Sequence, residues 1–173
     1  MKLRNILDII FETVNKRTYG CAMLYFKFPK ITELHSYIEE EDLLTKEVEP
    51  HCTLLYGLHD NVSLDSIKKI VSKYEFGKCT INNISLFETD EYDVLKFIVS
   101  GKSIYECNSD LKKLPHTNPY DEYNPHLTVA YLKSGTGSKY VKLFNEKKIR
   151  EFTVDPTYII YSTTDKVKFK IDL

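Results

Sequence analysis

Two histidines in this chain stand in the same local pattern. The tetrapeptide Pro-His-Cys-Thr at 50–53 returns as Pro-His-Leu-Thr at 125–128, and a tyrosine follows each histidine at the same offset, as Tyr56 and Tyr131. Each copy opens an apolar run, and the two copies lie in different halves of a 173-residue chain. The repetition indicates a duplicated unit that delivers two imidazoles to one place.

Two facing imidazoles can divide acid and base roles in one displacement, because histidine gains and loses a proton near neutral pH. Phosphodiester cleavage needs this division: one histidine removes a proton from the attacking hydroxyl or water, and the other protonates the departing oxygen. A threonine hydroxyl can donate a hydrogen bond to a non-bridging phosphate oxygen, where charge must be held. We therefore predict that His51, Thr53, His126 and Thr128 are catalytic, in chemistry that requires no metal.

Side chains two apart on a strand share a face, so each histidine points with its threonine. Tyr56 and Tyr131 stand at odd offsets from their histidines. Strict alternation therefore predicts that these two tyrosines point to the opposite face, into the core.

A metal site and a cysteine nucleophile are the alternative interpretations of these histidines and cysteines. A zinc or iron site would need a third ligand at a recognisable spacing, and the sequence has none. His35, His59 and His116 are expected to be ordinary hydrogen-bonded polar residues, since nothing near them specifies a partner. The four cysteines are widely spaced, which favours reduced thiols, and Cys52 is expected to face the core rather than act as a nucleophile.

Composition predicts one globular domain over residues 1–173, since 42% of the residues are apolar and 28% charged. The formal net charge of −1 argues against a protein that tracks long nucleic acid, but it is compatible with a small nucleotide. Asp8 and Glu12 interrupt the first apolar run, and no segment has the length of a membrane span. We expect a cytoplasmic protein; its oligomeric state is left open.

The elements that must position the motifs follow from periodicity. Apolar spacing predicts a helix over 3–14, and alternation predicts a strand over 19–28. The even positions of that strand are uniformly apolar, so the odd face is expected to look into a cleft or at another sheet. Tyr19 and Tyr25 lie on that odd face, which makes them candidates for stacking on a nucleotide base.

The rest of the chain alternates short helices and strands. Helices are expected from 31 to 38, 64 to 71, 102 to 114 and 139 to 145, the second with Ser63 as its N-cap. Strands are expected at 51–58, 79–87, 92–100, 126–132, 149–154, 158–163 and 167–171. The acidic run 39–42 is interpreted as a solvated face. These elements predict an α+β protein with largely antiparallel sheets in two similar lobes.

The paired His-x-Thr motifs resemble those of the 2H phosphoesterase superfamily. The resemblance covers essentially the whole sequence. It implies a bilobal, LigT-like fold of two pseudo-symmetric lobes, in which antiparallel sheets and helices surround a central cleft. It also implies phosphodiester chemistry on nucleotides or RNA ends, without a cofactor. Stretches 19–26 and 49–59 resemble the phage anti-CBASS group within that superfamily, although this chain has no tryptophan to stack on a base.

The leading hypothesis is thus a phosphodiesterase that cleaves cyclic di- or oligonucleotide messengers, which in a phage would serve immune evasion in the host cytoplasm. An RNA 2′,3′-cyclic phosphodiesterase or a 2′-5′ linkage-processing enzyme is the alternative within the same class. A non-catalytic nucleotide sponge is the alternative of another class. The sequence does not decide which histidine is base, which linkage is cut or which base is preferred.

Overall fold

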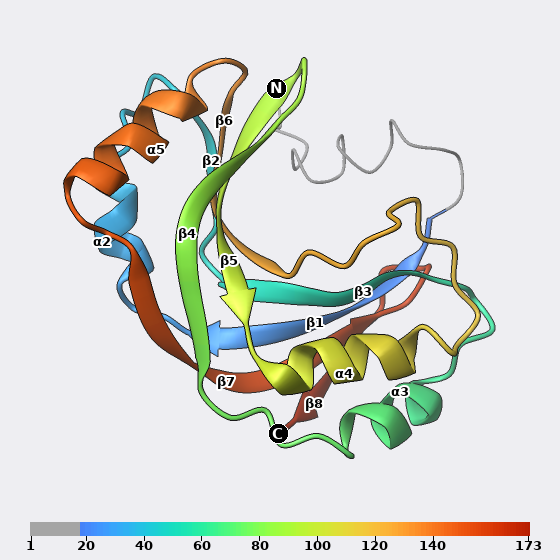
Figure 1. Cartoon of the computed structure of the whole chain (residues 1–173). Helices are drawn as coiled ribbons and strands as arrows, with labels where there is room; N and C mark the ends of the chain where they lie inside the picture. Colours follow the sequence, from blue (N-terminus) through green and yellow to red (C-terminus); the bar gives the residue numbers. More distant parts are fainter. Residues whose placement is uncertain (1–17) are drawn as a thin grey trace.

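A computed structural model describes residues 18–173, whose strands form one bent antiparallel sheet (Figure 1). The strands are β1 (Gly20–Lys27), β2 (Leu43–Lys46), β3 (His51–Leu58), β4 (Cys79–Glu88), β5 (Tyr92–Ser100), β6 (His126–Lys133), β7 (Glu151–Ser162) and β8 (Lys168–Asp172). Their order in the sheet is β2-β6-β5-β4-β7-β1-β3, and β8 pairs with β7. The predicted α+β class with antiparallel strands is confirmed. The helix expected over 3–14 lies outside the described residues.

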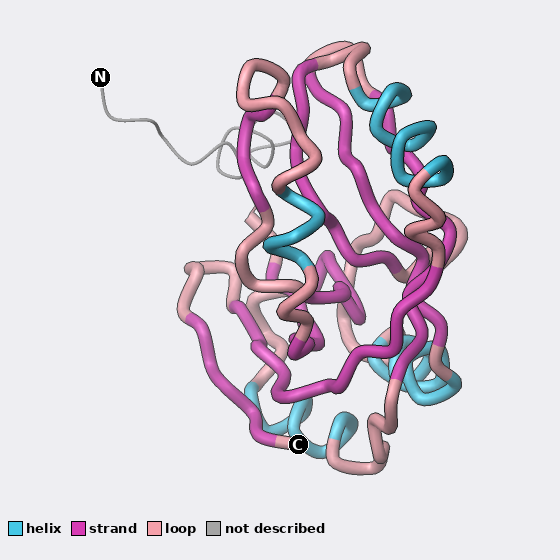
Figure 2. The backbone as a smooth tube through the Cα atoms, turned by 90° about the vertical axis from the view of Figure 1, so that its left-hand side faces the viewer, coloured by secondary structure: helices cyan, strands magenta, loops and turns pink. Residues whose placement is uncertain are grey.

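The described helices are α2 (Ile31–His35), α3 (Leu64–Val71), α4 (Lys102–Leu111) and α5 (Gly137–Glu146). Helix α4 packs on β3 and α3 packs on α4, whereas α5 packs on β4 and β5 and α2 packs on β6 (Figure 1). A view turned by 90° shows the same separation into two helical groups (Figure 2). Within the described part of the chain, no helix is long and apolar enough to cross a membrane.

The apolar faces predicted from periodicity form the core beneath each half of the sheet. Ile104, Cys107 and Leu111 recur along one face of α4 and are fully buried, because that face packs on the sheet. Ser63 caps α3 as predicted, since its hydroxyl accepts a hydrogen bond from the backbone N–H of Ser66 at 3.2 Å.

Strand β7 joins the two halves of the sheet, and here the sequence prediction was wrong. The sequence predicted two strands with a break, but residues 151–162 form one strand. Its first part, from Glu151 to Val154, pairs with β4, and the part from Asp155 to Ser162 pairs with β1. Pro156 is tolerated because it lies at a register shift, where a strand can lack one N–H donor. The two predicted lobes therefore share a strand.

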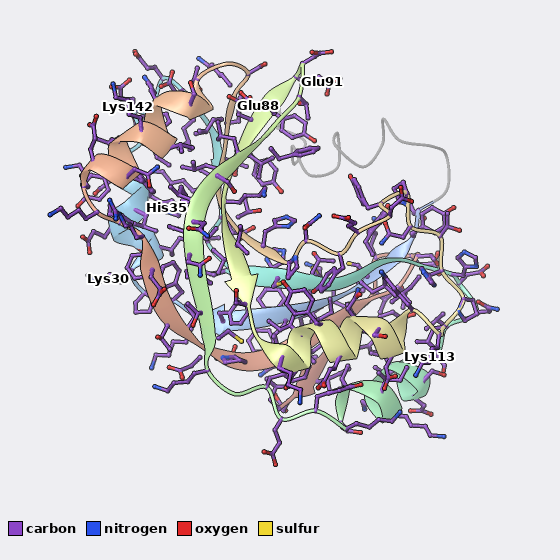
Figure 3. All side chains as sticks on the ribbon, in the orientation of Figure 1. Lys30, His35, Glu88, Glu91, Lys113 and Lys142 are labelled. Atoms are coloured by element: carbon purple, nitrogen blue, oxygen red, sulfur yellow. The ribbon has the colours of Figure 1, made fainter. Side chains whose placement is uncertain are left out.

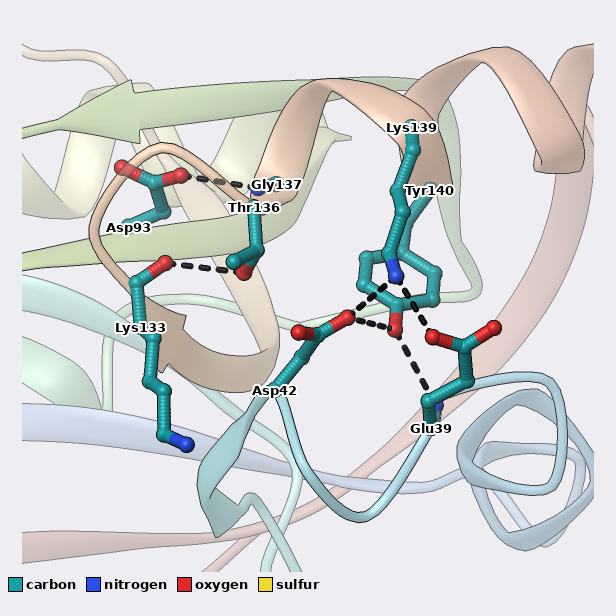
Figure 4. A network of polar contacts seen from close by, with 8 residues as sticks. All are labelled: Glu39, Asp42, Asp93, Lys133, Thr136, Gly137, Lys139 and Tyr140. Atoms are coloured by element: carbon teal, nitrogen blue, oxygen red, sulfur yellow. Dashed lines mark hydrogen bonds and ion pairs between the residues drawn. The ribbon is translucent and has the colours of Figure 1, made fainter.

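The acidic run before β2 is not simply solvated, contrary to the expectation from sequence. Asp42 is 8% exposed and accepts a hydrogen bond from the Tyr140 hydroxyl, and the Lys139 ammonium pairs with both Asp42 and Glu39 (Figure 4). Hydrogen bonds from Lys139 and Tyr140 lower the pKa of Asp42. These contacts tie the run to α5. Strand β2, which the sequence did not reveal, then begins at Leu43 and pairs with β6.

The start of α5 is fixed from the sheet side as well. The buried carboxylate of Asp93 on β5 accepts a hydrogen bond from the backbone N–H of Gly137 at 2.8 Å, and the Thr136 hydroxyl donates to the Lys133 carbonyl at 2.8 Å (Figure 4). A carboxylate at this end complements the partial positive charge of a helix N-terminus. Helix α5 is thereby attached to β5 and to the end of β6, the second motif strand.

Candidate active site

Each motif strand has an extra residue directly after its threonine, at the same position of the repeat. Along β3 and β1, Thr53 stands opposite Met23 and Leu55 opposite Ala22, so Leu54 is extra. Along β6 and β5, Thr128 stands opposite Lys96 and Ala130 opposite Leu95, so Val129 is extra. An extra residue of this kind is a β-bulge, and beyond it the alternation of side chains is reversed.

The bulges place each tyrosine of the repeat beside its histidine and threonine. In the first motif, the register sets His51, Thr53 and Tyr56 opposite Tyr25, Met23 and Cys21 of β1, respectively. In the second motif, it sets His126, Thr128 and Tyr131 opposite Ile98, Lys96 and Val94 of β5, respectively. The partners within each set are alternate residues of one unbulged strand stretch, so they share a face. The prediction that Tyr56 and Tyr131 point into the core is therefore wrong, and both are half-buried. We call the side that carries these six motif residues the motif face.

A side chain from a neighbouring helix holds the carbonyl of each bulged residue. The amide of Asn108 in α4 donates to the Leu54 carbonyl at 2.6 Å, and Nε2 of His35 in α2 donates to the Val129 carbonyl at 2.8 Å. Both side chains belong to buried residues, and burial lowers the pKa of His35. His35, which Figure 3 labels beside α2, is thus the hydrogen-bonded polar residue that the sequence predicted.

The two motif histidines are oriented by the same contact. Nδ1 of His51 donates to the Glu49 carbonyl and Nδ1 of His126 donates to the Asn124 carbonyl, each at 2.9 Å. A carbonyl oxygen can only accept, so the neutral rings carry their proton on Nδ1 and keep a lone pair on Nε2. Each imidazole is therefore ready to accept or deliver a proton through Nε2.

The prolines of the repeat have an equivalent role in the two copies. The Pro50 carbonyl accepts from the N–H of Phe26 at 2.9 Å, and the Pro125 carbonyl accepts from the N–H of Val99 at 3.0 Å. Proline has no N–H, but its carbonyl still pairs with the adjacent strand. Both motifs thus enter their strands in the same way.

The surroundings of the two histidines differ in charge. Loss of water around His126 lowers its pKa below the usual value of 6.5; the Asn124 carbonyl opposes this, while positive charge on Lys96 and on His51 adds to it. Strands β3 and β6, which begin with these two histidines, contact each other. His51 instead has a carboxylate oxygen of Glu47 at 3.8 Å from Nδ1.

Tyr25 lies on the motif face, as the odd-face prediction required, but its ring is covered. It is 7% exposed and is stacked on His51, with centroids 5.1 Å apart, and on Tyr158, with centroids 4.9 Å apart. Burial raises the pKa of its hydroxyl. We therefore assign Tyr25 to the support of His51 rather than to a nucleotide base.

Tyr19 is half-buried and contacts the tyrosine of the first motif. Its ring meets Tyr56 edge to face at 6.1 Å and stacks on His59 at 5.9 Å. The second motif has the equivalent pair, since Tyr131 meets Tyr92 edge to face at 6.0 Å. One pair of tyrosines thus accompanies each His-x-Thr motif. Sequence reasoning missed three of these four tyrosines, and the repeated offset of Tyr56 and Tyr131 was the signal for two of them.

The loop before the second motif is attached to the first motif strand. The N–H of Thr117 donates to the Gly57 carbonyl at 2.9 Å, and the Tyr123 hydroxyl donates to the Thr53 carbonyl at 2.9 Å. Gly57 has φ +96, and a Cβ there would lie 1.9 Å from the Thr117 carbonyl oxygen, so this close approach requires glycine. The loop thereby fixes the position of His126 relative to His51.

Comparisons with known proteins agree on the architecture. No protein-family model and no curated protein matches this sequence. Among solved structures, Usb1 from Kluyveromyces marxianus superposes with a TM-score of 0.58 at 10% identity, over 91% of this chain and 99% of that one. A structure of the same Usb1 with uridine monophosphate gives a TM-score of 0.60 at 10% identity and the same coverage. The chain thus has the fold of Usb1.

Proposed function

We propose that this protein is a metal-independent phosphodiesterase of the 2H type, with His51 and His126 as its acid and base. The observation that carries the proposal is the equivalence of the two motifs. In both, Nδ1 is bound to a carbonyl two residues earlier, the threonine shares the histidine's face, and the second ring nitrogen is left for proton transfer. Mere binding of a nucleotide does not require two such rings.

The surroundings support different roles for the two rings. The pKa of His126 is lowered, which favours the neutral ring that a general base requires. His51 instead has the Glu47 carboxylate 3.8 Å from its Nδ1 and the ring of Tyr25 stacked on it, so we assign it the role of general acid. In this assignment Nε2 of His126 takes the proton of the attacking hydroxyl or water. His51 then gives a proton to the oxygen whose bond to phosphorus breaks.

The substrate we propose is a cyclic di- or oligonucleotide. One tyrosine pair beside each motif offers aromatic surface on either side of a phosphodiester, and stacking on aromatic rings holds bases with little sequence preference. The formal net charge of −1 favours a small ligand over long nucleic acid.

A second substrate class is favoured by one specific observation. The structural neighbour Usb1 has been solved with uridine monophosphate, a single nucleotide of the kind found at RNA ends. Processing of an RNA 2′,3′-cyclic phosphate or of a 2′-5′ linkage is therefore the alternative activity. It predicts turnover of linear RNA ends and indifference to cyclic messengers.

The test is a substrate panel incubated in EDTA: cyclic dinucleotides, cyclic trinucleotides, 2′-5′ oligoadenylate and RNA with a 2′,3′-cyclic phosphate end. His51→Ala and His126→Ala should each lower the rate by at least about a hundredfold, because general acid–base catalysis contributes about 10²–10⁴-fold. His116→Ala, which removes a ring whose Nδ1 donates to the Leu114 carbonyl, should remain active. Binding without turnover of any panel member would refute the enzyme and favour the sponge.

A further inference from the structure

Lys96 lies on the motif face beside the second motif. It belongs to β5, directly opposite Thr128 on β6 and Ser85 on β4. Its ammonium group is 3.4 Å from the Ser85 hydroxyl, and its charge acts on His126. The lysine, two hydroxyls and a motif histidine therefore converge on one part of the sheet.

The charge of Lys96 has no acidic counterpart within the described part of the chain. Other lysines pair with carboxylates, as Lys139 does with Asp42 and Lys113 with Asp110. Among residues 18–173 the ammonium group of Lys96 has a polar contact with the Ser85 hydroxyl, and partial burial lowers its pKa. Partial removal of an ammonium group from water costs free energy unless an anion or hydrogen bonds compensate.

A bound phosphate would supply that compensation. Lysine binds phosphate as a point charge, and a hydrogen bond between charged groups is stronger than one between neutral groups. The Thr128 hydroxyl is on the same face and next to the lysine, so both can reach non-bridging oxygens of one phosphate. The same positive charge opposes protonation of His126, which keeps that ring competent as a base.

We propose that Lys96, together with the hydroxyls of Ser85 and Thr128, forms a phosphate-binding site that holds the non-bridging oxygens of the phosphodiester beside His126. This inference rests on the proposed function for the identity of the reacting group. The binding of phosphate itself does not depend on turnover.

The experiment measures binding of inorganic phosphate and of uridine monophosphate to the full chain by nuclear magnetic resonance, following the ring protons of His126. Lys96→Met keeps the aliphatic stem and removes the charge; we expect at least about tenfold weaker binding of both probes, as loss of a charged hydrogen bond predicts. Lys96→Arg should bind within about threefold of the wild type, since the charge is retained. Lys142→Met, on the exposed side of α5, removes the same charge elsewhere and should bind like the wild type (Figure 3).

A second reading of the same spectra tests the position of the charge. Titration without ligand should give a higher pKa for His126 in Lys96→Met than in the wild type or in Lys142→Met. The groups that act on this ring are Lys96 from β5, His51 from β3 and the Asn124 carbonyl, and only the first is changed. Equal phosphate affinity in Lys96→Met and Lys142→Met would overturn the proposal. So would the absence of phosphate binding by the wild type at roughly 10 mM, since weak sites have dissociation constants on the millimolar scale.

The outcomes separate this site from the proposed activity. If the wild type cleaves no panel member but binds phosphate through Lys96, the phosphodiesterase is refuted and the phosphate site stands. If the wild type cleaves its substrate and Lys96→Met binds and cleaves equally well, the phosphate site is refuted and the activity stands.

Discussion

Replacing Asn108 by alanine tests whether the β-bulge in the first motif depends on the helix beneath it. Asn108 is 4% exposed, and its amide donates to the Leu54 carbonyl at 2.6 Å. Removal of this donor leaves a buried carbonyl without its side-chain partner, which costs roughly 1–3 kcal/mol. In a protein of this size each kcal/mol lowers Tm by about 2–4 °C, so we expect a decrease of about 2–12 °C.

The same change should affect catalysis separately from stability. Leu54 follows Thr53 directly, so a relaxed bulge displaces the hydroxyl and the imidazole from their shared orientation. A displacement of about 1 Å in a catalytic group can lower the rate about a hundredfold, and we expect a fall in kcat of about ten- to a hundredfold.

Urea denaturation and thermal melting measure the loss of stability. Initial rates measure the fall in kcat, at roughly 10 °C, where a variant that has lost a few kcal/mol of stability still stays folded. Asn145→Ala, at an exposed position in α5, is the matched control and should change neither quantity. Wild-type stability in Asn108→Ala would refute the claim that the amide supports the bulge. A stability loss with full activity at 10 °C would show that the bulge does not position Thr53.

Three further predictions follow from other contacts. Gly57→Ala should lower the free energy of unfolding by roughly 2–3 kcal/mol, because of strain at φ +96 and the close approach to the Thr117 carbonyl. The control Gly135→Ala, at φ +80 with open space around it, should lower the free energy of unfolding by about 1 kcal/mol. Equal losses of the two variants in urea denaturation would contradict the close approach. Burial lowers the pKa of folded His35 below 6.5, so the unfolded chain binds the proton first as pH falls and the free energy of unfolding declines below about pH 6.5. His35→Gln can still donate to Val129 and should flatten the decline between about pH 7 and 5 in urea titrations; an unchanged slope would assign the effect elsewhere. Tyr131→Leu should raise KM about tenfold with little change in kcat if its ring stacks on a base, and steady-state kinetics with an unchanged KM would remove it from the binding surface.

Several features of this protein follow from local sequence alone. The repeated His-x-Thr pattern predicted two strands whose histidine and threonine share a face, and both strands begin at the predicted residue. These predictions succeeded because the bulge in each strand lies after the threonine, at Leu54 and Val129, and leaves the alternation between histidine and threonine intact. Periodicity likewise placed α3 and α4, because each has an apolar stripe that is buried, in α4 against β3 and in α3 against α4.

Other features depend on segments far apart in the chain. The bulges that return Tyr56 and Tyr131 to the motif face are held by side chains 54 and 94 residues away, so no local pattern announces them. Strand β7 is continuous because its first part pairs with β4 and its second part pairs with β1, where Pro156 lies at a register shift.

The candidate site shows the same division. Sequence determined the four groups His51, Thr53, His126 and Thr128, because their residue types and spacing are themselves the signal. Only the tertiary structure placed Lys96 opposite Thr128 and gave the two histidines unequal surroundings. Electrostatic effects act across space between strands, so the unequal surroundings on which the proposed acid and base roles rest arise only when the sheet has folded.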